Sequence, residues 1–201
     1  MSELQLWMRL IFNLASINVY GRRRLDWRED LAKIYDQLLK QKHIERVLEI
    51  GTGFSVHLKV LIDKLKNSSI YTLDPNKFAL VEAEKLFSEQ VKSGRLHLRM
   101  GEAEYLPFPD SSFDLVTSAT TLHHVEDVEK VAGEIYRVLK PGGIIIVMDW
   151  TPESRFNPHS PEKTEERMKA VYEAFRKYFP DLKEIRKKDY YILIAEKKAT
   201  A

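Results

Sequence analysis

The chain has 201 residues, a length typical of one domain with a well-buried core. Lys and Arg number 32 against 30 Asp and Glu, so no strong overall charge attracts the protein to nucleic acid. Cysteine is absent, which excludes disulfides, thiolate zinc sites and a cysteine nucleophile. A chain without cysteine suits a reducing compartment, and we expect a cytoplasmic protein.

Apolar residues at the N-terminus recur at helical spacing and predict an amphipathic helix. Glu3, Arg9 and Asn13 interrupt this apolar run, so it falls short of the ~20 apolar residues of a membrane span. No basic start precedes a small-residue cleavage site, and we expect no signal peptide. A second helix is predicted over residues 28–42. The two predicted helices together form a helical lid or appendage over residues 1–42.

From residue 43 to 201, short β-type runs alternate with helical runs, which predicts a single α/β domain. The β-type runs are "RVLEI", "SIYTLD", "RLHLRM", "FDLVTSA", "IIIVMDW", "LKEIRK" and "YYILIAEK". Helices are predicted around 58–65, over 76–91, over 126–139 up to "KPGG", and in a segment that ends near Tyr178. Such alternation indicates a doubly wound, mostly parallel sheet with helices on both faces. The last two runs are too close for a crossover helix, so they form an antiparallel hairpin.

The stretch "VLEIGTGFSV", residues 47–56, places Gly51 and Gly53 directly after the first strand. In a doubly wound sheet, ligands bind beyond the carboxyl ends of the strands. Glycines let a ligand lie against the main chain, and the following helix offers free N–H groups. A nicotinamide dinucleotide prefers G-x-G-x-x-G, but Val56 occupies the sixth position and Phe54 crowds the start of the helix. That alternative is weakened and stays open.

Four motifs resemble, in the same order, those of class I S-adenosylmethionine-dependent methyltransferases. They are "LEIGTGFS", "YTLDPN", "GEAEYLPFPDSSFDLV" and "LHHVEDVEKVAGEIYRVLKPGG", and they cover roughly residues 44–150. The last is similar to the signature of the small-molecule, type 11-like branch. The resemblance implies a Rossmann-like sheet of seven strands in the order 3-2-1-4-5-7-6 and S-adenosyl-L-methionine as methyl donor. Two residues depart from the pattern: Ser55 replaces the third glycine, and Glu102 replaces the usual aspartate.

The resemblance also implies which residues bind the cofactor. They are Tyr20, Glu49, Gly51, Thr52, Gly53, Phe54, Asp74, Pro75, Gly101, Glu102, Ala103 and Ala119. Asp74 would accept hydrogen bonds from the ribose hydroxyls, Glu49 would bind the amino group of the methionine moiety, and Glu102 would read the adenine. Three alternatives stay open: Asp74 caps a helix, Glu49 forms a surface salt bridge, and Phe54 is a core residue.

Methyl transfer from a sulfonium is an in-line displacement that releases a neutral thioether, so alignment supplies most of the rate. A base is needed only if the acceptor loses a proton. His123 and His124 follow the fourth strand and are the catalytic candidates, whereas the alternative is that they pack or cap the next helix. Metal-dependent methyl transfer would need a cluster of carboxylates at the ends of the fourth and fifth strands. Asp149 is the only clear acid at the end of the fifth strand, so we predict no metal.

Tyr20 and the arginines 22–24 precede the first strand, where this family often closes over its cofactor. An arginine there could hold the methionine carboxylate. The same segment also suits a dimer contact, a solvated helix flank or an anionic membrane surface. We expect a monomer or homodimer that methylates a small-molecule acceptor. We expect no dedicated nucleic-acid module. A protein or RNA acceptor, a non-catalytic cofactor-binding subunit and a nicotinamide oxidoreductase are the alternatives.

Overall fold

Seven strands form one sheet in the computed structural model, which describes residues 27–198. The strand order is β3-β2-β1-β4-β5-β7-β6, which confirms the order that the resemblance implied. The strands are β1 (Arg46–Ile50), β2 (Ser69–Asp74), β3 (Leu96–Met100), β4 (Phe113–Ala119), β5 (Leu139–Trp150), β6 (Lys183–Arg186) and β7 (Tyr190–Glu196). The first five are parallel to one another. β7 is antiparallel to both β5 and β6, so the predicted C-terminal hairpin is confirmed.

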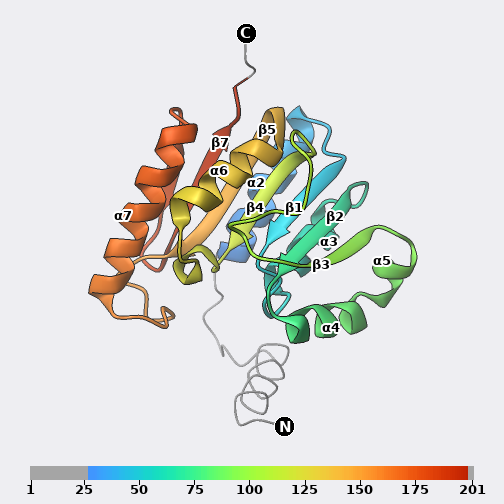
Figure 1. Ribbon diagram of the computed structural model, residues 1–201, viewed down its shortest axis with the longest axis horizontal. Coiled ribbons are helices and arrows are strands. Elements are labelled where there is room, and N and C mark those ends of the chain that lie inside the picture. Colours follow the sequence, from blue (N-terminus) through green and yellow to red (C-terminus); the bar gives the residue numbers. More distant parts are fainter. Residues whose placement is uncertain (1–26, 199–201) are drawn as a thin grey trace.

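Helices cover both faces of the sheet (Figure 1). They are α2 (Trp27–Gln41), α3 (Val56–Lys64), α4 (Lys77–Leu86), α5 (Ser88–Lys92), α6 (Val128–Val138) and α7 (Pro161–Tyr178), with a short 3-10 helix, η1 (Leu122–His124). The helices α6 and α7 lie in front of the sheet in Figure 1, and α2 and α3 lie behind it. This arrangement confirms the doubly wound fold.

Two predicted element boundaries differ from the structure. The helix predicted over 76–91 is divided at Phe87 into α4 and α5, because Phe87 leaves helical geometry with a ψ of 36°. The helix predicted over 126–139 ends at Val138, directly before "KPGG" as expected, but the strand predicted as "IIIVMDW" begins earlier, at Leu139. Leu139 already pairs with Phe113 of β4, so β5 includes the "KPGG" turn, and the register shifts beyond it.

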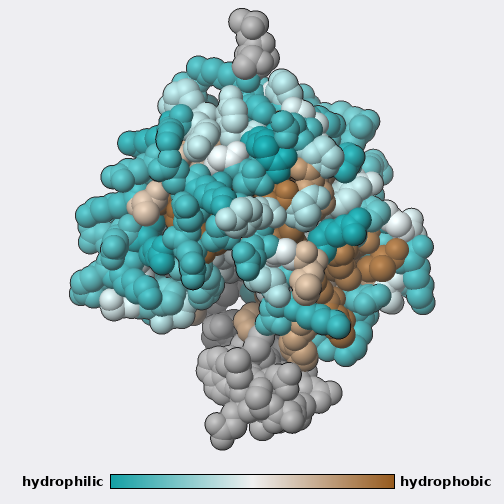
Figure 2. Space-filling view, in the orientation of Figure 1, coloured by the Kyte–Doolittle hydropathy of each residue, from teal (hydrophilic) through white to brown (hydrophobic). Residues whose placement is uncertain are grey.

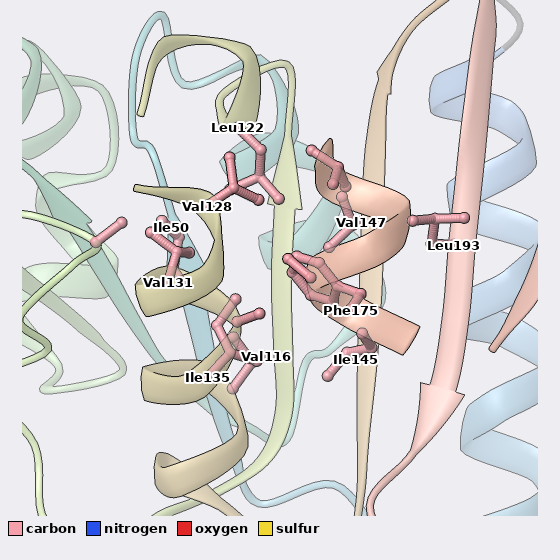
Figure 3. Packing of buried hydrophobic residues seen from close by; sticks show 14 of the residues in the cluster. Ile50, Val116, Leu122, Val128, Val131, Ile135, Ile145, Val147, Phe175 and Leu193 are labelled. Atoms are coloured by element: carbon pink, nitrogen blue, oxygen red, sulfur yellow. The ribbon is translucent and has the colours of Figure 1, made fainter. Parts of the chain in front are cut away.

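Two apolar clusters, one on each face, hold the sheet between its helices. In the first, Val131 and Ile135 of α6 and Phe175 of α7 pack on Val116 and Val147 of the central strands (Figure 3). In the second, α2 and α3 pack on the opposite face. The central strands therefore carry apolar side chains on both faces, as expected of a buried parallel sheet.

The surface in the view of Figure 2 is mostly hydrophilic, and apolar residues gather over β3 and α4, where Met100 and Leu86 are exposed. Among the described residues, no helix combines the length and apolarity that crossing a bilayer requires. Residues 1–26, which include the first predicted helix, lie outside the described part of the chain.

Candidate functional site

The turn after β1 contains three residues with left-handed backbone angles. Their φ values are 88° at Gly51, 45° at Gly53 and 59° at Ser55. The left-handed region costs a residue with a Cβ about 1–2 kcal/mol, which explains why glycine is favoured at each of these positions. Ser55 therefore adopts the backbone conformation of the glycine that it replaces.

Gly51 and Gly53 meet different surroundings. A Cβ on Gly51 would lie 2.6 Å from Thr121 Cγ2, so the missing side chain makes room for the segment after β4. A Cβ on Gly53 would meet no described atom within 4 Å. The expectation that glycine leaves room for a ligand therefore applies to Gly53, whereas Gly51 is required by packing within the protein.

Asp74, the last residue of β2, is joined to this turn. Its Oδ2 accepts a hydrogen bond of 2.8 Å from the backbone N–H of Gly53. Its Oδ1 accepts another, also of 2.8 Å, from the backbone N–H of Asn76. The residue that caps α4 is Asn76, whose side chain accepts from Phe78 N, so the alternative of Asp74 as the helix cap is wrong.

Glu49 is fully buried, which rules out the alternative of a surface salt bridge. Its Oε2 accepts a hydrogen bond of 2.6 Å from the Thr72 hydroxyl, which also bonds the Thr52 hydroxyl at 2.7 Å. Its Oε1 lies 3.0 Å from His57 Nδ1, but neither atom completes a hydrogen bond of good geometry with a described residue. Glu49 thus keeps one buried carboxylate oxygen with unused acceptor capacity.

The polar network continues from His57 into α2. The Tyr35 hydroxyl is hydrogen-bonded to His57 Nε2 at 2.8 Å and to Thr117 Oγ1 at 2.9 Å. Complete burial raises the pKa of Tyr35 far above its ordinary value, so its phenol stays protonated. No sequence pattern singled out Tyr35 or His57, because they join Glu49 only when α2 and α3 pack on the sheet.

The other predicted cofactor residues lie at or just beyond the carboxyl ends of β1 to β4. Thr52 and Ala119 are buried, and Phe54 is 40% exposed, so the alternative of Phe54 as a core residue is wrong. Pro75 directly follows β2, while Gly101, Glu102 and Ala103 follow β3. The structure thus gathers these residues at the carboxyl ends of the parallel strands, where ligands bind in such sheets. Tyr20 and the arginines 22–24 lie outside the described residues.

His123 is buried at the end of β4 and held by Asp149 from β5. Its Nδ1 lies 2.6 Å from Asp149 Oδ1, and its backbone N–H donates to Oδ2 at 3.1 Å. Because a carboxylate accepts hydrogen bonds, this contact favours the tautomer of the neutral imidazole that carries its proton on Nδ1 and its lone pair on Nε2. Asp127 caps α6 by accepting from Lys130 N, so neither histidine is the helix cap.

Sequence reasoning missed a third histidine in this place. His159, in the loop before α7, forms ring contacts with both His123 and His124, with centroids 5.4 and 5.6 Å away. Burial, followed by the neighbouring His123, lowers the pKa of His124 to about 4, and burial also lowers that of His159. The spacing of 35 residues between His124 and His159 offers no local signal that could have found the cluster.

A glycine turn joined to an acid at the end of the next strand, on a sheet of this order, is the arrangement that the resemblance to class I S-adenosylmethionine-dependent methyltransferases implied. Residues 48–147 match the Methyltransferase domain family of type 11, the branch that the resemblance indicated. The chain therefore belongs to this family by domain and by fold.

Curated methyltransferases match part of the chain, and two of them illustrate the similarity. The Sterol 24-C-methyltransferase of Aspergillus fumigatus is 30% identical over 117 residues, 58% of this chain and 31% of the relative. The Demethylmenaquinone methyltransferase of Leptospira interrogans is 35% identical over 117 residues, 51% of this chain and 47% of the relative. This chain thus spans less than half the length of either protein.

Among the solved structures that match, one covers nearly the whole chain. It is a putative S-adenosyl-L-methionine-dependent methyltransferase from Methanococcus maripaludis, with a TM-score of 0.70 and 18% sequence identity. The match covers 96% of this chain and 93% of that one. At this identity the likeness supports the fold, and it extends beyond the domain match into α7, β6 and β7.

Proposed function

We propose that the chain transfers the methyl group of S-adenosyl-L-methionine to a small-molecule acceptor. We also propose that the donor binds at the carboxyl ends of β1, β2 and β3. The open space beside Gly53 is the observation that carries this proposal. A φ of 45° there favours glycine, yet no described atom of the protein uses the space that the missing side chain leaves. Unlike Gly94, Gly53 lies beside Asp74 at the carboxyl ends of the strands, so a ligand against the main chain is proposed to use that space.

The polar groups around this space fit the donor. Asp74 uses each carboxylate oxygen for one backbone N–H, and the remaining lone pairs can accept from the two ribose hydroxyls. The ammonium group of the methionine moiety is proposed to bind at this end of the site, where the buried Glu49 carboxylate favours a positive charge. The backbone after Gly101, with Glu102, is proposed to bind the adenine.

Bound S-adenosyl-L-methionine supplies a sulfonium methyl group that leaves a neutral thioether behind. The residues of this chain hold the donor, align the acceptor and exclude water. The contact of Thr121 with Gly51 brings the segment that carries His123 and His124 against the glycine turn. We propose that these imidazoles orient an acceptor hydroxyl or amine, or take its proton. The lid was predicted over 1–42, but α2 packs on the sheet as part of the core, so only the segment before α2 is proposed to close this site.

The acceptor is proposed to be a small molecule, since both relatives above are named for small-molecule methylation. A protein or RNA acceptor remains the second candidate, and the domain match argues against the nicotinamide alternative. The cytoplasmic location, the monomeric or dimeric state and a membrane-surface contact through the N-terminal helix are proposals carried over from the sequence.

Calorimetric titration of the full chain with S-adenosyl-L-methionine and, separately, NAD tests the donor assignment. We expect binding of the first alone, and a loss of about tenfold or more in affinity for Asp74→Ala, which removes two charge-assisted hydrogen bonds. Asp63→Ala, an exposed acid of α3, is the control and keeps wild-type affinity. A wild-type chain that ignores the donor, or an Asp74→Ala variant that binds it equally well, contradicts the proposal.

Methyl transfer across acceptor classes then tests the histidines. We expect His123→Ala and His124→Ala to lower turnover while donor affinity is retained, because neither imidazole is placed in the donor site. Unchanged turnover in both variants would rule out a catalytic role and leave them as packing residues. Transfer to protein or RNA alone would replace the small-molecule acceptor with the second candidate.

A further inference from the structure

We propose that His123, His124 and His159 form a binding site for one divalent transition-metal ion, of which Zn²⁺ is the representative. Three of the six histidines of the chain converge here, and their ligand nitrogens all lie within 4.8 Å of one another. The prediction of no metal relied on the lack of a carboxylate cluster. Three imidazoles are a different donor set, and it suits Zn²⁺, Cu²⁺ or Ni²⁺.

His123 is prepared as a ligand by its partner Asp149. The carboxylate holds the ring through Nδ1 and the backbone through N–H, so Nε2 is fixed in direction with a free lone pair. Metal-binding histidines almost always donate their other ring N–H to such an acceptor, which sets the tautomer and raises ligand basicity. Asp149 also accepts from Trp150 N at 2.9 Å, so it is itself held in place.

His159 arrives from the loop between β5 and α7, and hydrogen bonds order this loop. The backbone N–H of His159 donates to Asn157 Oδ1 at 3.0 Å, and the Asn157 amide donates to Thr164 of α7. Arg167 of α7 donates to the carbonyl of Val125, directly after η1, at 3.1 Å. These bonds tie the two histidine-bearing segments together, and rigid supports are what a metal site requires.

The ring nitrogen His159 Nε2 is buried and makes no hydrogen bond with a described residue. A buried nitrogen without a partner is costly, and a metal ion would satisfy it. Ligand nitrogens around a tetrahedral zinc ion lie about 3.4 Å apart, given Zn–N bonds of ~2.1 Å. His124 lies on the exposed side of the cluster, where a change of its side-chain rotamer would shorten the remaining gap.

The surroundings also indicate what completes the coordination. Asp149 is the acid of the cluster, while Lys163 and Arg167 act electrostatically on His159. Three neutral imidazoles leave the charge of the ion largely uncompensated, and a trio of protein ligands leaves at least one position open. An anionic oxygen ligand therefore fits the open position best. This inference does not depend on the proposed donor binding, since the three rings and Asp149 belong to the protein alone. In the metal-bound chain, His123 and His124 would act on an acceptor through the ion and not as free bases.

Metal binding is measured on the full chain without a histidine tag, after removal of metal by a chelator and in the absence of S-adenosyl-L-methionine. Zn²⁺ is titrated in competition with a colorimetric chelator, and Co²⁺ is followed by its visible ligand-field absorption. We expect one ion per chain and a Co²⁺ spectrum of four or five coordination. His159→Ala should lower Zn²⁺ affinity by about 100-fold or more, and Asp149→Asn by ~10–100-fold at unchanged stoichiometry.

His43→Ala is the matched control, because the His43 side chain is 77% exposed and lies near Glu45 on another part of the surface. It should bind Zn²⁺ like the wild type. Circular dichroism and donor affinity establish that each variant is folded, and the exposed His124→Ala takes the place of any variant that is not. Absence of stoichiometric Zn²⁺ binding by the wild type, or equal affinities of the wild type and His159→Ala, overturns the proposal. Donor binding, measured without metal, reports on the proposed function separately.

Discussion

The backbone N–H of Gly53 donates a hydrogen bond of 2.8 Å to Asp74 Oδ2, and this bond joins the ends of β1 and β2. The two residues therefore act as one unit, since a change in the carboxylate also releases the turn. The bond explains how the site keeps its shape before a donor arrives. It also implies that Asp74→Ala acts on affinity both directly and through the glycine turn.

Gly53→Val is expected to abolish donor binding while the chain still folds. A Cβ at Gly53 meets no described atom within 4 Å, so the substitution fills only the space assigned to the ligand. The cost to folding is the strained φ of 45°, about 1–2 kcal/mol. Calorimetric titration with S-adenosyl-L-methionine measures the affinity, and chemical denaturation measures the free energy of unfolding.

Gly94→Val is the matched control for this change. Gly94 has a φ of 72°, and a Cβ on it would likewise meet no described atom within 4 Å. It lies between α5 and β3, however, at the amino ends of the parallel strands and away from the proposed donor site. Both variants should lose similar stability, and only Gly53→Val should lose the donor. Equal donor affinity in the two variants would mean that the space beside Gly53 is not used.

Ser55→Gly is expected to stabilise the protein by about 1 kcal/mol. Ser55 has a φ of 59°, and its buried hydroxyl makes no hydrogen bond with a described residue. Glycine removes both costs, and these outweigh the entropy that it adds to the unfolded chain. The free energy of unfolding measured in urea tests this expectation, and a loss of stability would show that the hydroxyl is engaged.

Tyr35→Phe is expected to lower the free energy of unfolding by about 2–3 kcal/mol. The change leaves His57 Nε2 and the Thr117 hydroxyl in the interior without their shared partner. Tyr105→Phe is the control, because the Tyr105 side chain is 65% exposed and its loss of a hydroxyl should cost little. Urea denaturation of both variants measures the difference, and equal stabilities would contradict the buried network.

Asp114→Asn is expected to destabilise the protein near neutral pH but not in acid. Burial alone would raise the pKa of Asp114, but bonds from Lys140 and from the backbone of Arg46 and Glu45 lower it overall. A lowered pKa means that the stabilisation is complete above the ordinary value near 4 and is lost as the pH falls through the lowered value. Urea denaturation from pH 7 to 2 should therefore show the two proteins converging in acid. A difference that persists at low pH would assign the effect to shape instead of charge.

Much of the fold could be predicted from the sequence because its signals are local. Apolar periodicity and turn residues predicted all seven strands and the C-terminal hairpin. The strand order came from the resemblance of four motifs instead, since no local pattern specifies which strands pair. The break at Phe87 was missed because a single residue leaves helical geometry within an otherwise helical pattern.

The candidate site divides in the same way. The glycine turn and Asp74 were visible because short motifs encode the backbone angles and the strand end that a ligand requires. Only packing decided that Thr121 occupies the space beside Gly51, that Glu49 is buried with Thr72, and that His159 joins the two histidines after β4. Such contacts join residues from separate elements of the chain. Their geometry depends on how the helices and loops pack on the sheet, and local sequence patterns do not predict this packing.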